Sequence, residues 1–129
     1  MKKLVSITPA SGPVALGHYS PGILAGNLLF VSGQIAVTEA GISLASESLA
    51  VQTRQALGNM RAVIEASGAQ LDQVAKVTVY LADPEGWPVF NQIYADFFGD
   101  HKPTRAVVPV NAFYGGFLVE VDAVVFLGN

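Results

Sequence analysis

The sequence contains no cysteine in its 129 residues and only two histidines, His18 and His101. Disulfide bonds, thiolate nucleophiles and cysteine-ligated metal sites are therefore excluded, and the cytoplasm is the expected compartment. The two histidines form no HxH or HExxH arrangement, so no metal site is expected. No glycine-rich phosphate loop and no GxGxxG motif occurs either, and we expect no cofactor.

Charge is also scarce. Charged residues make up 13% of the chain and hydrophobic residues 51%, and the net charge is −3. A small monomer needs more polar groups to cover its surface, so this composition predicts a second buried surface and hence an oligomer. The sequence contains no cluster of lysine and arginine of the kind that binds nucleic acids. No apolar run has the length of a signal peptide or of a membrane span, so neither is expected.

The hydrophobic pattern predicts an α+β domain in the order β-β-β-α-β-α-β-β. Alternating or continuous apolar runs indicate strands, and apolar spacings of three and four indicate helices. In 22–37 two apolar runs meet at Gly26-Asn27, a turn pair that predicts a hairpin. The expected elements are strands at 3–7, 22–37 (the hairpin), 74–82, 105–110 and 117–127, helices at 46–67 and 85–99, and a loop at 11–22.

Two helices cannot cover both faces of such a sheet, so we expect them to pack on one face. The second helix has an apolar stripe of Val89, Phe90, Ile93, Phe97 and Phe98. In the last strand, alternate residues from Phe117 to Val125 are apolar and can face the helices. The opposite face carries Glu120 and Asp122 among apolar residues, which predicts that another subunit covers it.

Arg105 and Glu120 are the candidate chemical groups, because each lies in an apolar strand. The short segment 111–116 predicts that these two strands pair as a hairpin and bring the two side chains together. One interpretation is a structural Arg–Glu ion pair, since buried charges need partners. The other is a carboxylate-binding fork at Arg105 with Glu120 as a proton-transfer group. The sequence leaves both open.

Several stretches together resemble the Rid family, the reactive-intermediate deaminases also called YjgF-type proteins. They run in the family's order across about 14–126, and they are GHYSPG (17–22), NLLFVSGQIA (27–36), QTRQALGNMRAVIEASGA (52–69), KVTVYLAD (76–83), FNQIYADFFG (90–99), KPTRAVVPV (102–110) and LVEVDAVV (118–125). The resemblance implies one chorismate-mutase-like domain over 1–129 and a homotrimer. In the family, a central β-barrel is surrounded by helices and the sites lie between subunits.

The resemblance also implies an activity: cofactor-free hydrolysis of reactive enamines and imines, such as 2-aminoacrylate, to 2-oxo acids and ammonia. The family's carboxylate-binding arginine corresponds to Arg105 and its water-positioning acid to Glu120. Further residues at family site positions are Tyr19, Ser32, Gly33 and Asn91. No metal, nucleic acid or membrane partner is implied.

The chain departs from the family pattern at Val107, where many relatives have cysteine or a small polar residue, and in the aromatic segment 111–118. Val107 is expected in the substrate site, where it would favour a more apolar substrate. These departures keep an alternative open: a protein that binds or responds to a 2-oxo acid or an aromatic acid without turnover.

Overall fold

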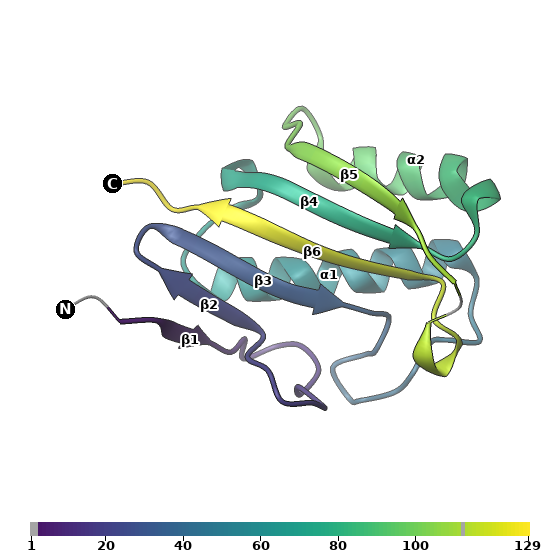
Figure 1. The fold of residues 1–129 in the computed structure, drawn as a ribbon, viewed down its shortest axis with the longest axis horizontal. Helices are drawn as coiled ribbons and strands as arrows, with labels where there is room; N and C mark the ends of the chain where they lie inside the picture. Colours follow the sequence, from purple (N-terminus) through teal and green to yellow (C-terminus); the bar gives the residue numbers. More distant parts are fainter. Residues whose placement is uncertain (1–2, 112) are drawn as a thin grey trace.

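The computed structural model describes residues 3–111 and 113–129. Figure 1 shows one mixed sheet with two helices behind it. The strands are β1 (Val5–Ile7), β2 (Gly22–Ala25), β3 (Leu28–Gln34), β4 (Val74–Leu81), β5 (Thr104–Pro109) and β6 (Val119–Phe126), and the helices are α1 (Leu49–Ala66) and α2 (Trp87–Phe98). The predicted order is confirmed, and each boundary differs from its prediction by at most three residues.

Local chemistry explains where these elements begin and end. The Ser48 side chain caps α1 by accepting a hydrogen bond from the backbone N–H of Val51, at 3.2 Å. The β2–β3 turn is made at Gly26, whose φ of +64° is accessible to glycine at no steric cost. Gly99 ends α2 with the same φ of +64° and turns the chain towards β5.

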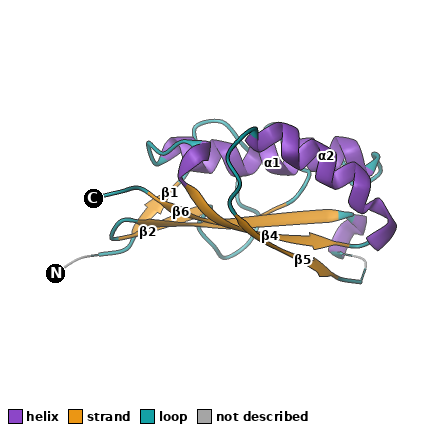
Figure 2. Cartoon of the chain, turned by 90° about the horizontal axis from the view of Figure 1, so that it is seen from above, coloured by secondary structure: helices purple, strands orange, loops and turns teal. Residues whose placement is uncertain are grey.

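Both helices lie on one side of the sheet, as predicted (Figure 2). The helix-facing residues of β4 and β6 are buried, and they form the core with apolar residues of α1 and α2. Neither helix of the described residues covers the opposite side, called here the open face. It exposes Phe30 by 46%, Val108 by 37% and Phe126 by 45%.

The strand order corrects one prediction. β6 lies between β3 and β4 and is antiparallel to both, whereas β5 lies at the sheet edge and pairs with β4 in parallel. The predicted hairpin of 105–110 with 117–127 is therefore wrong. β4, α2 and β5 instead form a crossover unit, in which the helix returns the chain to the same end of the sheet and leaves the two strands parallel.

The predicted apolar stripe of α2 also needs correction. Phe90 and Phe98 are buried as expected, but Val89 is 47% exposed and the third buried side chain is Tyr94. Positions 90, 94 and 98 repeat every four residues and so share one side of the helix. This places the Tyr94 ring against the sheet.

Candidate functional site

Arg105 lies on the helix side of β5. Its register partner in β4 is Val77, which is fully buried beneath the helices, and paired residues of neighbouring strands point to the same face. Val107 follows two residues later on the same face and pairs with the buried Val79. β5 therefore presents Arg105 and Val107 in line, next to α2.

The guanidinium of Arg105 is held by one stripe of α2. Its carbon Cζ lies 4.7 Å from the ring centroid of Trp87 and 4.7 Å from that of Tyr94. Its Nη1 donates a hydrogen bond to Oδ1 of Asn91, at 3.1 Å. These three residues stand at i, i+4 and i+7 and so lie along one side of the helix. Two aromatic faces and one amide orient the arginine.

The start of β5 is tied to the start of β4 by side-chain hydrogen bonds. The Thr104 hydroxyl donates to the carbonyl of Ala75 at 2.7 Å. Nε2 of His101 lies 2.8 Å from the carbonyl oxygen of Val74, which requires a donating Nε2–H. Because an edge strand has a ladder on one side only, these two bonds help to set the register that aims Arg105 at α2.

Arg105 borders a hollow of about 310 Å³, whose lining residues include Asn91, Tyr94, His101 and Lys102. Burial raises the pKa of Tyr94 to about 12, against a smaller lowering by the charge of Arg105. Tyr94 therefore remains a neutral phenol near pH 7. Its hydroxyl has no hydrogen-bond partner among the described residues. The ring serves as a platform beneath the arginine.

Glu120 lies on the open face of β6, opposite Tyr80 of β4 in register. Its carboxylate lies over Gly33: a Cβ built on that glycine would stand 2.6 Å from Glu120 Oε2. Any side chain at position 33 would displace the carboxylate. Asp122, two residues further along the same face, accepts a hydrogen bond from the Tyr80 hydroxyl at 3.1 Å.

Ser32 connects this region to the loop that carries Tyr19. Its hydroxyl donates to the carbonyl of Ser20 at 2.6 Å, and its backbone N–H donates to the carbonyl of Pro21 at 2.9 Å. Both bonds fall where the register of β3 with β6 shifts, between Val31 and Gln34. Ser32 therefore holds the loop beside the strand, and Tyr19 itself is 52% exposed.

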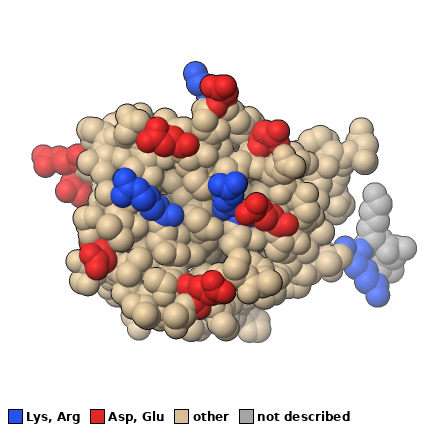
Figure 3. All heavy atoms as spheres, turned by 180° about the vertical axis from the view of Figure 1, so that it is seen from behind, with Lys and Arg blue, Asp and Glu red and all other residues tan. Residues whose placement is uncertain are grey.

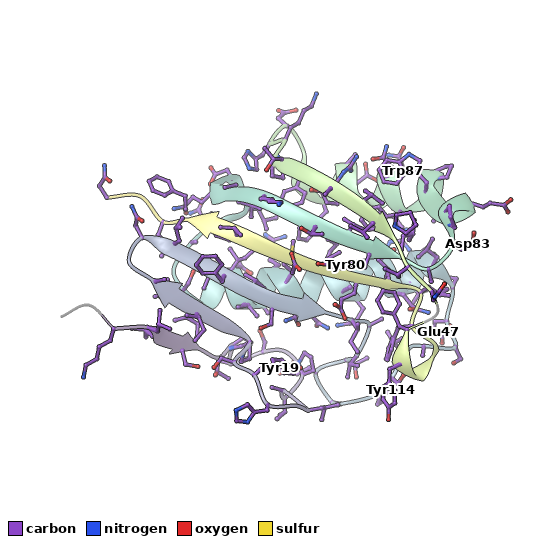
Figure 4. The ribbon with its side chains drawn as sticks, in the orientation of Figure 1. Tyr19, Glu47, Tyr80, Asp83, Trp87 and Tyr114 are labelled. Carbon is purple, nitrogen blue, oxygen red and sulfur yellow. The ribbon has the colours of Figure 1, made fainter. Side chains whose placement is uncertain are left out.

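The predicted site residues, joined by Trp87 and Tyr94, form two groups. The arginine group comprises Trp87, Asn91, Tyr94, Arg105 and Val107, and the glutamate group comprises Tyr19, Ser32, Gly33 and Glu120. Within one chain Arg105 and Glu120 lie on opposite faces of the sheet, with β4 between β5 and β6. Figure 4 shows Trp87 at the start of α2, near one edge of the sheet, and Tyr19 near the other. The predicted proximity of Arg105 and Glu120 is therefore wrong for a single chain, as is an ion pair between them there.

Sequence reasoning did not find Trp87 and Tyr94 as partners of Arg105, nor Tyr80 as the partner of Asp122. A signal for the first two was available, because Trp87, Asn91 and Tyr94 share one side of a helix that directly precedes the arginine strand. In the described residues, no three acidic, histidine or cysteine side chains gather as a metal cluster would require. None of the helices described there has the length and hydropathy needed to cross a bilayer.

Comparison with known proteins assigns the fold to a family. The family model described as "Endoribonuclease L-PSP" matches residues 9–127. The chain belongs to this family, which is also known as the Rid family. The resemblance inferred from the sequence is confirmed, together with the α+β fold.

Individual relatives cover almost the whole chain. A RutC family protein of Pyrococcus horikoshii is 38% identical over 126 residues, covering 98% of both chains. A human protein named 2-iminobutanoate/2-iminopropanoate deaminase is 35% identical, covering 95% of this chain and 89% of that one. The crystal structure of a Rid family protein from Yersinia pestis has a TM-score of 0.91 at 32% identity, covering 96% of this chain and 99% of that one.

Glu120 should make the folded protein less stable when it is ionised. Burial, with a smaller contribution from the charge of Asp122, raises the pKa of Glu120 above its usual value. The folded state therefore binds this proton more tightly than the unfolded chain does, and the stabilisation is lost as pH rises from the unfolded to the folded pKa. We expect Glu120→Gln to raise the melting temperature at about pH 7 and to change it little below about pH 4, where the carboxyl is protonated in both states.

Thermal unfolding of both proteins at the two pH values measures this difference. The exposed Glu39 provides the control, because Glu39→Gln removes an equal charge from the surface. A melting temperature that falls at neutral pH in Glu120→Gln alone would contradict the expectation.

Proposed function

We propose that this Rid family protein hydrolyses reactive 2-imino acids and their enamine tautomers to 2-oxo acids and ammonia, at a site assembled from two subunits. The observation that supports the proposal is the way in which the side chains of α2 hold and orient the guanidinium of Arg105. A guanidinium has five N–H donors in a planar fork suited to a carboxylate, and Asn91 accepts from one of them. The name of the human relative, an iminobutanoate and iminopropanoate deaminase, supports the same substrate class.

The proposed assembly of the site from two subunits follows from the positions of the arginine group and the glutamate group. An arginine group and a glutamate group on opposite faces cannot act on one small molecule within one chain, but they can meet when the open face of one copy packs near α2 of the next. The open face exposes Phe30, Val108 and Phe126, which need cover. A ring of identical head-to-tail interfaces would unite the groups at every interface. The homotrimer implied by the family is the assembly we propose.

Each group then has a defined task. Arg105 binds the substrate carboxylate and fixes the position of the imine carbon. Glu120 accepts a proton from water as the water oxygen attacks the carbon of the protonated imine, which gives a carbinolamine. The same carboxyl then returns the proton to the amino group, the C–N bond breaks as the hydroxyl proton passes to the departing ammonia, and the 2-oxo acid and an ammonium ion leave. Positioning and general acid–base transfer are the two contributions that this mechanism needs. The raised pKa of Glu120 suits a group that must both accept and donate a proton.

A competition assay tests the activity. An amino-acid oxidase, with catalase, generates imino acids in the presence of semicarbazide, which traps them. Less trapping and faster ammonia release with the protein present is the expected result. No acceleration for small, branched or aromatic imino acids would overturn the proposal, and a retained 2-oxo acid would then favour binding without turnover.

Cleavage of RNA, which the name of the matched family model suggests, has less physical support. The net charge is −3, and on the helix-covered side in Figure 3 basic and acidic residues are interspersed. RNA binding depends on neutralising many phosphates and weakens steeply with salt. Salt-sensitive binding of a single-stranded RNA would contradict this argument.

A further inference from the structure

An apolar hollow lies beside Arg105. It has a volume of about 250 Å³, and its lining residues are all apolar: Leu81, Pro84, Trp87, Val107 and Pro109. Pockets for drug-sized ligands usually measure roughly 300–1,000 Å³. This hollow is smaller and suits one amino-acid side chain.

Two residues join the hollow to the arginine. Trp87 lines the hollow and also carries the guanidinium of Arg105 on its ring, 4.7 Å from the centroid. Val107 lines the hollow from the same face of β5, about 7 Å along the strand from Arg105. A ligand whose carboxylate is bound at Arg105 can therefore place a branched aliphatic side chain against Val107 without moving either residue.

The hollow on the other side of Arg105 is chemically different. Its lining includes apolar side chains such as Phe98, but unlike the first hollow it also contains Asn91, His101 and Lys102, which offer hydrogen bonds and a positive charge. An apolar side chain would desolvate these groups without satisfying them, which costs free energy. Apolar substituents should therefore enter the hollow beside Val107, and the polar hollow should hold water or the polar end of a ligand.

We infer that the preferred substrates are 2-imino acids with bulky apolar side chains, branched aliphatic ones in particular, and that Val107 and Trp87 select them. The inference rests on the proposed function, since it takes Arg105 as the carboxylate site, and it adds the substrate class. One methylene in an apolar pocket changes kcat/KM by about 10-fold or more. The imino acid derived from leucine should therefore be preferred to that derived from alanine by at least about 10-fold.

The experiment measures kcat/KM for these two imino acids, generated in situ by an oxidase, with the native protein and two variants. Val107→Phe fills the hollow, and Val107→Thr keeps its size but replaces a methyl group with a hydroxyl. Val107→Phe should lower the leucine-to-alanine ratio about 10-fold or more, and Val107→Thr should lower it by a smaller factor. The ratio compares two substrates on one protein, so a general loss of activity does not affect it. Val51→Phe makes the same change at a 38%-exposed position of α1 and should leave the ratio unchanged.

A native ratio near one, or a ratio that both variants leave unchanged, would overturn the inference while deamination itself stands. If no imino acid is hydrolysed, the proposed activity fails, but the hollow can still be tested by calorimetry. Native protein should then bind 4-methyl-2-oxopentanoate more tightly than pyruvate, and Val107→Phe should abolish the difference. Equal affinities would reject the selective hollow as well.

Discussion

Replacing Arg105 with alanine is expected to lower kcat/KM for imine hydrolysis by about 100-fold or more, because a substrate without its carboxylate anchor loses the alignment of its reacting carbon. The loss should appear in both kcat and KM, since the same contact binds the substrate and orients it. Arg105→Lys keeps the charge but not the planar fork or the stacking on two rings. The activity of Arg105→Lys should fall between that of the native protein and that of Arg105→Ala.

The fold should survive the loss of Arg105. The side chain is exposed, and its ring contacts at Trp87 and Tyr94 are worth about 0.5–1 kcal/mol each. Light scattering should give an unchanged assembly. Arg61→Ala is the matched control, because Arg61 pairs with Glu65 on an exposed surface of α1 and should have little effect on activity or stability. Full activity in Arg105→Ala would reject the carboxylate role.

The elements of the fold were predictable because their patterns are strong. Apolar and acidic residues alternate in β6 from Val119 to Ala123, so its buried face could be assigned from the sequence, and the periodicity of α1 spans several turns. The predicted pairing of β5 with β6 is wrong because a short connection between two strands is also typical of a hairpin, whereas here β5 pairs with β4 across the helix. A strand–helix–strand order favours parallel neighbours and was the more informative signal.

The candidate site was predicted as a set of residues but not as an arrangement. Which face Arg105 occupies could not be inferred, because Ala106, Val107 and Val108 follow one another without alternation in an edge strand exposed on both sides. The location of Gly33 beneath Glu120 depends on the register shift in β3, and no local sequence pattern predicts that shift. Face and register are properties of the folded sheet, and they separate the two groups.

This separation predicts that two inactive variants will restore activity when they are mixed. Arg105→Ala keeps an intact glutamate group, and Glu120→Gln keeps an intact arginine group. If each site takes one group from each of two neighbouring subunits, random mixing of equal amounts makes about a quarter of the sites complete. Sites built within one chain would recover nothing. The measurement is deaminase activity after the two variants are unfolded and refolded together, compared with each variant refolded alone.

Gly33 supplies the control for this experiment. Gly33→Ala places a Cβ 2.6 Å from the present position of Glu120 Oε2, so it should displace the carboxylate and inactivate the glutamate group without changing its charge. Mixed with Glu120→Gln, it should restore nothing, because both defects fall in the same group and no subunit carries an intact copy. Mixed with Arg105→Ala, it should restore about a quarter of the sites, as Glu120→Gln does. Recovery in the first mixture would mean that Gly33 and Glu120 act in different groups, contrary to their contact in the fold. Recovery in the second mixture alone would place Gly33 and Glu120 together on one side of the interface and Arg105 on the other.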